Sequence, residues 1–304
     1  MPQRYAIIGT GALGGYYGCR LQHAGCDVHF LLHSDYDHVR QNGIICESKE
    51  GDFSLPKAKA YRRAQDIPAC DVTVVALKTT QNHYLPDLLP PTGIVLTLQN
   101  GFGNEDAIAK VTGPECVVGG LAFLCSNKVG PGHIRHLDYG HIAIGEFAKR
   151  GVTDRLRQIA ADFERAGIPC QTEPDLMVAR WKKLVWNIPY NGLSVILNAQ
   201  TDELMRHPAT RQLCEAIMYE VVADAHTCGS SLTADTVPTM LNYTEKMRPY
   251  RTSMKIDFDE HRPMEVEAIF GNPLRAAQAA GAKSPLLETL YRQLEFLNQR
   301  SANA

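Results

Sequence analysis

Short runs of consecutive apolar residues alternate with segments of helical periodicity over the first half of the chain. The runs lie at residues 4–9, 27–32, 71–77 and 93–99, and the helical segment after the first run is closed by Gly25. Unbroken apolar runs separated by helices are typical of parallel strands that are buried on both faces of a sheet. The pattern therefore predicts a doubly wound α/β domain.

Three further strand-like runs follow at closer spacing, at residues 117–125, 133–137 and 141–146. With a Gly-Pro-Gly turn at residues 130–132, they predict antiparallel additions at one edge of the sheet. A helix is then expected over residues 153–167, because its apolar positions have helical spacing.

The pattern changes at about residue 174, after which helical periods dominate to the end of the chain. A chain of 304 residues is long for a single hydrophobic core. We therefore predict two domains, an α/β domain over residues 1–173 and an all-helical domain over residues 174–304.

Composition narrows the classes of function. The formal net charge of −2 disfavours a nucleic-acid partner or an anionic membrane surface. We find no apolar run near the roughly 20 residues that a membrane helix needs, and no signal-peptide pattern. The nine cysteines are scattered, without a C-x-x-C pair or the spacing of metal ligands. They are typical of reduced thiols, so we expect a cytoplasmic protein without a metal site.

The sequence "GTGALGG" directly follows the first strand and has the pattern G-x-G-x-x-G. Such glycines allow a tight turn, a close approach of a pyrophosphate to the backbone, and helix packing on the strand. This context predicts a Rossmann-like dinucleotide site, with a ligand-free tight turn as the alternative. The residues expected to contact the dinucleotide here are Gly9, Thr10, Gly11, Ala12, Leu13 and Gly14.

The end of the second strand bears on the choice of cofactor. NAD sites usually place a carboxylate there, which holds the ribose 2′-hydroxyl. This chain has His33 and Ser34 instead, which favours NADPH because a 2′-phosphate would not be repelled. Asp35 lies one residue further on and keeps the alternative open.

The stretch "RWKKLVWNIPYNGLSVILN", at residues 180–198, is apolar but carries a lysine and three asparagines. At about 100° per residue, Asn187, Asn191 and Asn198 fall at about 40°, 80° and 60° from Lys183, on one stripe. The rest of the helix is apolar nearly all round, so we expect the stripe to face a ligand rather than bulk water. Pro189 predicts a kink. A surface lysine with asparagines that bond to neighbouring helices is the alternative.

The chemistry of ketone reduction suits this stripe. Transfer of a hydride to a ketone develops negative charge on the carbonyl oxygen, and a nearby acid must neutralise it. A partly buried lysine can serve as that acid, because burial lowers its pKa from about 10.4 toward neutrality. Asparagine side chains can orient a substrate through both donor and acceptor atoms.

Five motifs together resemble the ketopantoate reductases (2-dehydropantoate 2-reductases) over nearly the whole chain. They are "GTGALGG", "ALKTTQ" at 76–81, "LQNGFGNED" at 98–106, "WKKLVWNIPYNGLS" at 181–194 and "TSMKIDFDEHRPMEVEAIFGNPLRAA" at 252–277. The resemblance implies a dinucleotide-binding domain followed by a helical substrate-binding domain. It also implies NADPH-dependent reduction of 2-dehydropantoate to pantoate, as in pantothenate and coenzyme A biosynthesis.

The resemblance also implies roles for individual residues. Lys183 matches the general acid, whereas Lys182 and Asn198 match no functional residue of the family. Substrate-binding residues are implied at Asn100, Asn187, Asn191, Ser253 and Glu265, and further cofactor-binding residues at His33, Lys78, Asn100 and Glu265. Three of these residues have structural alternatives. Ser253 could instead cap a helix, Glu265 could interact with the dipole of a helix that starts near Pro263, and Lys78 could be a solvated residue at a strand end.

Three departures from the family pattern affect these implications. His33 stands where the family usually has arginine, Gln99 where histidine is common, and Thr201 where close relatives of the biosynthetic enzyme have asparagine. Reduction of a different 2-oxo acid is therefore one alternative, and a non-catalytic NADP-binding redox sensor is another. The sequence does not fix the oligomeric state, and a homodimer is one of the options.

Overall fold

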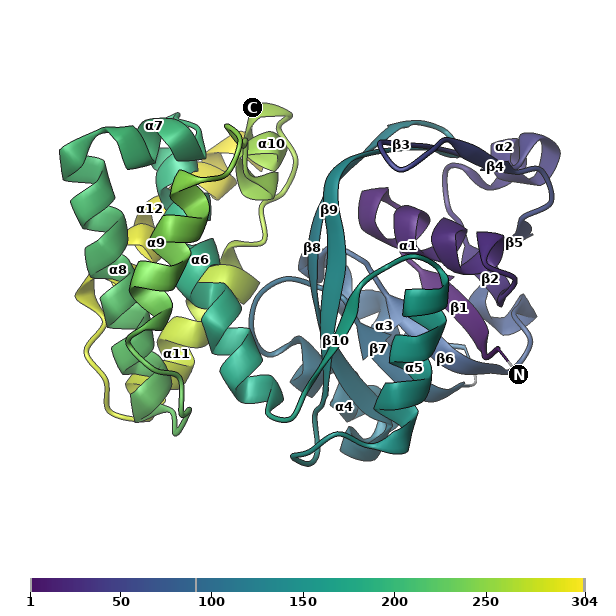
Figure 1. The fold of residues 1–304 in the computed structure, drawn as a ribbon, viewed down its shortest axis with the longest axis horizontal. Helices are drawn as coiled ribbons and strands as arrows, with labels where there is room; N and C mark the ends of the chain where they lie inside the picture. The colour runs from purple at the N-terminus through teal and green to yellow at the C-terminus, as the bar shows by residue number, and fades with distance from the viewer. Residues whose placement is uncertain (1, 91, 303–304) are drawn as a thin grey trace. The chain divides into compact units, whose positions relative to one another are not determined.

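The computed structural model describes residues 2–90 and 92–302. The chain divides into two compact units, each described here by itself. The first comprises Met1–Gln99 and Asn104–Leu176, and the second comprises Asn100–Gly103 and Met177–Ala304. In Figure 1 the first unit runs from purple to teal, and most of the second runs from teal through green to yellow.

A ten-stranded mixed sheet forms the centre of the first unit as far as the structure describes it. Its order is β4-β3-β9-β8-β7-β6-β1-β2-β5, and β10 pairs with β9. The strands are β1 (Arg4–Ile8), β2 (Asp27–Leu31), β3 (Ile44–Ser48), β4 (Phe53–Leu55), β5 (Lys59–Tyr61), β6 (Cys70–Val75), β7 (Thr92–Thr97), β8 (Val117–Gly130), β9 (His133–Glu146) and β10 (Cys170–Glu173).

The predicted parallel arrangement is confirmed at the centre of this sheet. Strand β1 pairs in parallel with β2 and β6, β6 pairs with β7, and β7 pairs with β8. The sequence did not reveal β3, β4, β5 and β10, which have only three to five residues each. None of them contains an unbroken apolar run as long as that of β1, which also has five residues.

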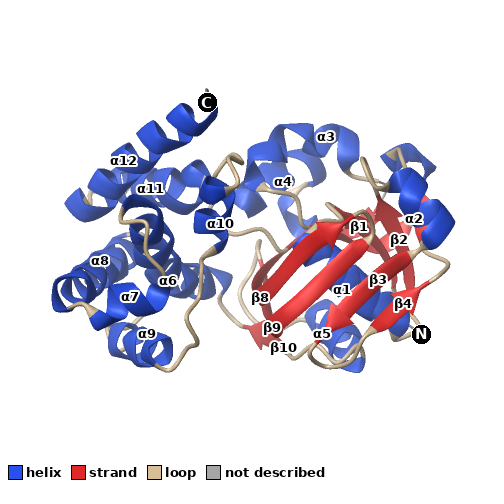
Figure 2. Cartoon of the chain, turned by 90° about the horizontal axis from the view of Figure 1, so that it is seen from above, coloured by secondary structure: helices blue, strands red, loops and turns tan. Residues whose placement is uncertain are grey.

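Helices cover both faces of the sheet, as a doubly wound fold requires (Figure 2). In β1, Tyr5 and Ile7 join the core under α1 and α5, whereas Ala6 and Ile8 point to the other face. This alternation explains why the strand is apolar at consecutive positions. The helices of the unit are α1 (Ala12–His23), α2 (Tyr36–Asn42), α3 (Leu85–Leu88), α4 (Asn104–Thr112) and α5 (Asp154–Arg165), with 3-10 turns η1 (Ala64–Asp66), η2 (Thr79–Tyr84) and η3 (Pro114–Cys116).

Strands β8 and β9 form one long antiparallel hairpin of 14 residues on each side. The antiparallel pairing was predicted, but the two runs at 133–137 and 141–146 belong to a single strand. The hairpin is also not at an edge of the sheet, because β3 and β10 pair with β9. At the position between the two runs, Tyr139 adopts a φ of 60° and the register shifts nearby. Such an irregularity bends a strand without ending its pairing.

Within its described residues, the second unit contains helices joined by loops and no strand, as predicted (Figure 1). Its core surrounds α6, whose Trp181, Leu184 and Ile188 are almost fully buried. None of the helices in residues 2–90 and 92–302 is long and apolar enough to cross a membrane. The helices are α6 (Leu176–Ile196), α7 (Thr201–Arg206), α8 (Pro208–Thr227), α9 (Thr236–Glu245), α10 (Ser253–Asp259), the π-helical turn η4 (Glu267–Gly271), α11 (Asn272–Ala279) and α12 (Pro285–Ala302).

The end of α6 corrects the predicted polar stripe. The helix stops at Ile196, and Asn198 lies beyond it, exposed and with a φ of 51°. The amide of Asn198 bonds to the carbonyl of Val195, and that of Ala199 to the carbonyl of Ser194. These are the two bonds of a Schellman motif, in which asparagine tolerates the left-handed position. Asn198 therefore ends the helix and does not belong to the buried stripe.

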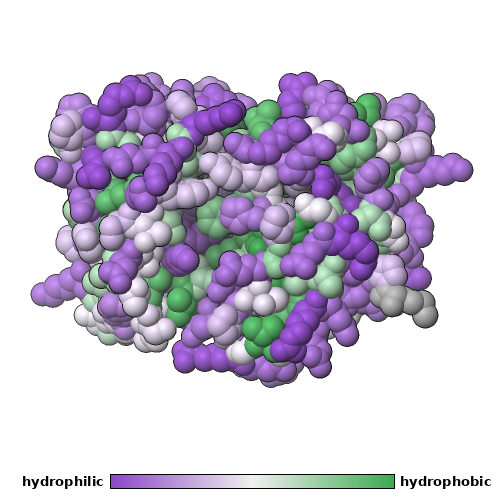
Figure 3. Space-filling view, in the orientation of Figure 1, coloured by the Kyte–Doolittle hydropathy of each residue, from purple (hydrophilic) through white to green (hydrophobic). Residues whose placement is uncertain are grey.

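The surface seen in Figure 3 is mainly polar, and apolar residues appear on it in scattered patches. Large side chains that are at least partly exposed, such as Ile45, Tyr84 and Phe296, come from different elements. Scattered exposure of this kind is ordinary for a folded surface and indicates no function by itself.

The aromatic cluster under α5 should contribute strongly to the stability of the first unit. Phe163 is fully buried, and its ring centroid lies 6.3 Å from that of Tyr5 and 6.0 Å from that of Tyr17. We expect Phe163→Ala to lower the free energy of unfolding by about 3–5 kcal/mol, because the core cannot close around the cavity. Chemical denaturation measures the change. Phe296→Ala is the control, since that ring is 62% exposed; a similar loss in both variants would contradict the prediction.

Candidate active site

The glycine motif forms the connection between β1 and α1, and two of its glycines are required by close backbone contacts. Gly9 has a φ of 93°, and a Cβ placed on it would lie 2.6 Å from the amide nitrogen of Leu77. A Cβ on Gly14 would lie 2.3 Å from the carbonyl oxygen of Gly9. The first contact keeps the turn tight against the loop after β6, and the second brings α1 close to β1.

Gly11 differs from these two glycines, because a Cβ placed on it would meet nothing within 4 Å. The absence of a side chain at Gly11 leaves an open space, the Gly11 cradle, beside the start of α1. That helix has no side-chain cap at its N-terminus and no acidic residue in its first turn. Helix N-termini of this kind suit phosphate groups. The loop therefore fits a dinucleotide, and Thr10, Ala12 and Leu13 lie on it, half-buried.

Three segments surround the glycine loop. The hydroxyl of Thr10 donates to the carbonyl of Leu31 at the end of β2, over 3.0 Å. The hydroxyl of Ser126 in β8 donates to the carbonyl of Ala12, over 3.2 Å. Lys78 follows Leu77, which packs on Gly9, and Lys78 is exposed at the start of η2. The predicted cofactor residue Lys78 is thus placed beside the loop.

The residues after β2 divide into an exposed and a buried part. His33 and Ser34 are exposed, whereas Asp35 is buried. The carboxylate of Asp35 accepts from the ammonium of Lys128 over 2.7 Å and from the amide of Gly132 over 3.0 Å. Burial would raise the pKa of Asp35, but these hydrogen bonds outweigh it and hold the pKa below its ordinary value. Asp35 is therefore an ionised carboxylate with partners on both oxygens.

In the second unit, α6 buries the predicted polar stripe. Lys183 is 6% exposed, Asn187 6% and Asn191 3%, and the helix runs through Pro189 without ending. Residues four apart lie on the same side of a helix, so the three side chains follow one another along it. The side-chain oxygen of Asn191 is buried and has no hydrogen-bond partner. An unsatisfied buried acceptor is costly, which is typical of a site that binds a polar ligand.

Lys183 has the pKa that a proton donor needs near neutral pH. Burial and, to a smaller extent, the nearby charge of Arg180 lower its pKa, whereas Glu265 raises it, and together they bring the pKa from 10.5 to about 7. A general acid works best when its pKa lies near the working pH. The environment of Lys183 therefore matches the role that the sequence suggested.

Glu265 and Asn100 belong to the same unit as Lys183. Glu265 is buried directly before the helical segment that contains η4. This segment starts at Val266, later than the expected Pro263, and the amide of Met264 donates to the side chain of Asn298. The loop after β7 packs on this segment, since the amide of Phe102 donates to the carbonyl of Ala268 over 2.7 Å. Asn100 is thereby held on the helical unit, although its sequence follows a strand of the sheet.

Ser253 is the first residue of α10, but it does not cap this helix. The cap is Thr252, whose hydroxyl accepts from the amide of Lys255. The hydroxyl of Ser194 lies 2.8 Å from that of Thr252 and donates to the carbonyl of Asn191 over 3.1 Å. A hydroxyl chain therefore connects the polar stripe of α6 to the start of α10, and the half-buried Ser253 is left outside the cap.

Thr201, at one of the departures from the family pattern, has a structural role. Its amide and hydroxyl both bond to the backbone of Tyr250, each over 3.2 Å, and the residue is buried. The Thr201 hydroxyl thus holds the segment before α10, which bears Ser253.

Two residues that lie near the candidate site were given no role from the sequence. Arg180 lies one turn before Lys183 on α6, and the helical spacing that revealed the asparagines could have found it. Gln99 is buried, and its side-chain amide donates to the carbonyl of Leu77 over 3.0 Å and to Asn82 over 2.7 Å. Gln99 thereby connects the loops that follow β6 and β7, a contact that no local pattern encodes.

The predicted residues fall into two sets. The glycine loop, His33 and Lys78 belong to the first unit, while the expected proton donor Lys183 and the expected substrate ligands belong to the second. The residues within 2–90 and 92–302 include no group of three or more His, Cys, Asp or Glu placed to hold a metal ion.

Comparisons with known proteins identify the family. Residues 5–149 match the family model "Ketopantoate reductase PanE/ApbA", and residues 175–298 match the model of its C-terminal part. The chain belongs to the ketopantoate reductase family. The resemblance noted in the sequence is thus confirmed, and with it the oxidoreductase class and the two-part fold.

Individual members of the family are similar along the whole chain. A 2-dehydropantoate 2-reductase of Nostoc sp. is 59% identical, covering 98% of this chain and 96% of the relative. The crystal structure of the enzyme from Geobacter metallireducens has a TM-score of 0.93 at 44% identity, covering 96% and 99% of the two chains. That of the enzyme from Methylococcus capsulatus has a TM-score of 0.91 at 33% identity, covering 99% and 98%.

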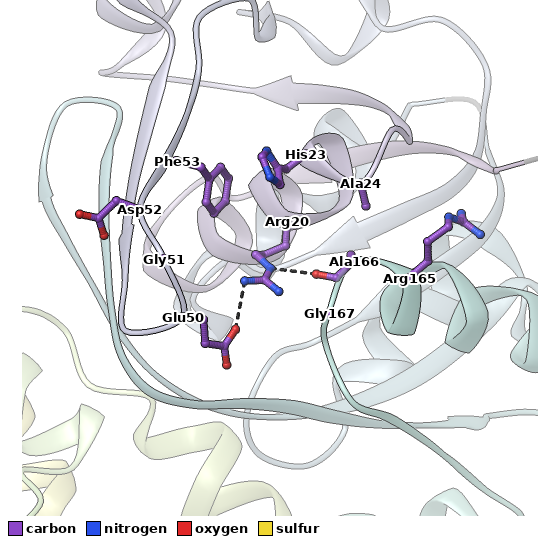
Figure 4. A pocket seen from close by; sticks show the side chains of 10 residues that line it. All are labelled: Arg20, His23, Ala24, Glu50, Gly51, Asp52, Phe53, Arg165, Ala166 and Gly167. Carbon is purple, nitrogen blue, oxygen red and sulfur yellow. Dashed lines mark hydrogen bonds and ion pairs between the residues drawn. The ribbon is translucent and has the colours of Figure 1, made fainter.

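A hollow of about 450 Å³ lies elsewhere in the first unit, beside the C-terminal ends of α1 and α5. Figure 4 shows Arg20 reaching from α1 toward Glu50 and the carbonyl of Ala166, at 3.0 Å and 2.8 Å. Arg165 pairs with Asp162. The arginines of this hollow are therefore matched by neighbours, and the hollow lies at the opposite end of α1 from the glycine loop.

The open position at Gly11 gives a direct test of the cofactor loop. Gly11→Ala should leave the melting temperature nearly unchanged, because its φ of −88° suits alanine and its Cβ has free space. The methyl group should nevertheless reduce dinucleotide binding about tenfold or more, since it occupies the approach to the helix N-terminus. Fluorescence titration with NADPH measures the effect.

The matched control for this variant is Gly93→Ala, whose Cβ would meet only a backbone oxygen at 3.6 Å. Equal binding by the Gly11→Ala and wild-type proteins would show that the Gly11 cradle does not receive the dinucleotide.

Proposed function

We propose that this chain reduces 2-dehydropantoate to pantoate with NADPH, as in pantothenate and coenzyme A biosynthesis. The observation that carries the proposal is the buried Lys183, with a pKa of about 7, at the head of a stripe of buried amides. Membership of the ketopantoate reductase family and the 59% identical 2-dehydropantoate 2-reductase support the substrate.

Lys183 serves as the general acid in this proposal. NADPH, when bound, supplies the hydride for C2 of the substrate. The negative charge that develops on the carbonyl oxygen is neutralised by a proton from the ammonium of Lys183. At a pKa of about 7, this ammonium loses its proton far more easily than an exposed lysine would.

The polar residues of the second unit hold the substrate. Asn187 and Asn191 orient it from α6, and the unpartnered oxygen of Asn191 accepts a hydrogen bond from a substrate hydroxyl. Ser253, whose hydroxyl is not needed to cap α10, binds the substrate carboxylate. Asn100 and Glu265 contact both the substrate and the cofactor.

The first unit provides the cofactor site. The phosphates bind along the loop from Gly9 to Gly14, with Thr10, Gly11, Ala12 and Leu13 lining it, and His33 and Lys78 lie at its sides. We assign residues 1–173 to the dinucleotide-binding domain and residues 174–304 to the substrate-binding domain. A cytoplasmic location and a homodimer also remain predictions, and the nine free thiols support the first of them.

A reductase of another 2-oxo acid is the nearest rival. Thr201 supports this rival, because its hydroxyl accepts from the backbone amide of Tyr250 and is therefore not free to select a substrate hydroxyl. A non-catalytic redox sensor is less well supported, since sensing requires no buried acid on the same helix side as an amide with an unsatisfied oxygen. An assay of NADPH and NADH consumption against a panel of 2-oxo acids separates the three. Strong activity with another acid and little with 2-dehydropantoate would favour the first rival; no activity beside cofactor binding would favour the sensor.

Replacement of the proton donor should abolish catalysis selectively. Lys183→Ala should lower turnover by about 10²–10⁴-fold while NADPH binding stays within about twofold, because only proton transfer is lost. Steady-state assays and fluorescence titration provide the two measurements. Lys182→Ala is the matched control, since Lys182 is the preceding residue of the same helix and is exposed. Wild-type turnover in Lys183→Ala would remove the assignment.

The pH profile should report the ionisation of Lys183. The protonated form is the acid, so the rate of reduction should be constant below the pKa of about 7 and fall about tenfold per pH unit above it. Arg180→Met should move this fall to higher pH, because removal of a neighbouring positive charge raises the pKa of Lys183.

The control for Arg180→Met is Arg206→Met, an arginine of the same unit whose side chain is 74% exposed. It should leave the profile in place. An unchanged profile in a folded Arg180→Met protein would contradict the electrostatic explanation.

A further inference from the structure

We propose that Lys128 is a specificity-determining residue that binds the 2′-phosphate of NADPH and at the same time neutralises Asp35. This inference rests on the proposed function, and it concerns a residue that no sequence motif of the cofactor site includes. It also provides an N–H donor for the 2′-phosphate in a chain that has His33 where the family usually has arginine.

The first step is the state of Asp35, the first carboxylate after β2. In a dinucleotide site of this fold, a carboxylate at this place holds the ribose 2′-hydroxyl of NAD and repels a 2′-phosphate. Here one oxygen of Asp35 accepts from Lys128 and from the hydroxyl of Ser34, and the other accepts from the amide of Gly132. A carboxylate that is buried and bonded on both oxygens is poorly placed to accept from a ribose.

The second step is the position of Lys128. It lies in β8, two residues after Ser126, whose hydroxyl bonds to the glycine loop at Ala12. The same loop is tied to the end of β2 through Thr10 and Leu31. The hairpin of β8 and β9 therefore borders both the glycine loop and the segment after β2, which is where this fold places the adenosine ribose.

The third step is the capacity of the ammonium group. Its side chain remains 33% exposed although it pairs with Asp35. An ammonium has three N–H donors, so the bond to Asp35 leaves donors for a phosphate. With Lys128 present, the pair carries no net charge; without it, the buried carboxylate would face a phosphate with about two negative charges.

Another cation near α2 lacks this connection. Arg62 pairs with the exposed Asp37 and lies over the ring of Tyr36, 4.6 Å from its centroid. No contact of the kind that Ser126 provides ties these residues to the glycine loop, among the hydrogen bonds of the described chain. Lys128 is therefore the better candidate.

The experiment measures the dissociation constants of NADPH and NADH by fluorescence titration of the purified protein without substrate. Lys128→Met should lower the preference for NADPH about tenfold or more, because a charge-assisted hydrogen bond is lost and Asp35 is left unpaired. Lys128→Arg should retain the preference within about threefold, since the charge is kept. Calorimetry with 2′,5′-ADP and 5′-AMP should show the same loss for the first fragment only.

The matched control is Lys49→Met, which removes a lysine of the same unit that pairs with Asp138. It should leave both dissociation constants unchanged. Preservation of the wild-type preference in Lys128→Met would overturn the inference.

The double variant Asp35→Asn/Lys128→Met removes both charges, so it leaves no unpaired buried carboxylate and should fold even if Lys128→Met does not. We expect it to have lost the preference for NADPH. A wild-type preference in this variant would show that Lys128 only neutralises Asp35, and would overturn its contact with the phosphate. Failure of the wild-type protein to bind either dinucleotide would overturn the proposed function, and this inference with it.

Discussion

The burial of one ammonium group is the constraint on which the second unit depends. A lysine taken out of water is costly to keep charged, and the neighbouring Arg180 adds to that cost. Glu265 offsets part of it, which requires the segment before η4 to lie close to α6. The packing of this unit therefore sets the ease with which Lys183 releases a proton.

Buried hydroxyl groups stabilise the packing of α6 and α10 through hydrogen bonds within the second unit. Ser194 connects α6 to Thr252, which caps α10, and Thr201 holds the backbone at Tyr250. These hydroxyls are buried and satisfied within the unit, whereas the oxygen of Asn191 is buried and unsatisfied. The contrast separates residues that maintain the structure of the unit from a residue with an oxygen that has no partner within it.

The first unit likewise contains residues required by the packing of the backbone and a residue that leaves open space. Gly9 and Gly14 are glycines because backbone atoms leave no room for a Cβ, whereas Gly11 is surrounded by space. Three neighbouring segments, from β2, β6 and β8, enclose the loop that these glycines form. Phosphate binding thus depends on a helix N-terminus that the strand packing has already put in place.

The sequence by itself determined the parallel sheet, the glycine turn and the stripe on α6, because each depends on the spacing of residues that are close in the chain. It misjudged Asn198, since the helix end is set by a Schellman motif rather than by the period. Only the tertiary structure paired Asp35 with Lys128, 93 residues apart, and lowered the pKa of Lys183 by burial, which Glu265 opposes in part. Such contacts join residues that are distant in the chain, and their strength depends on burial, which no local spacing encodes.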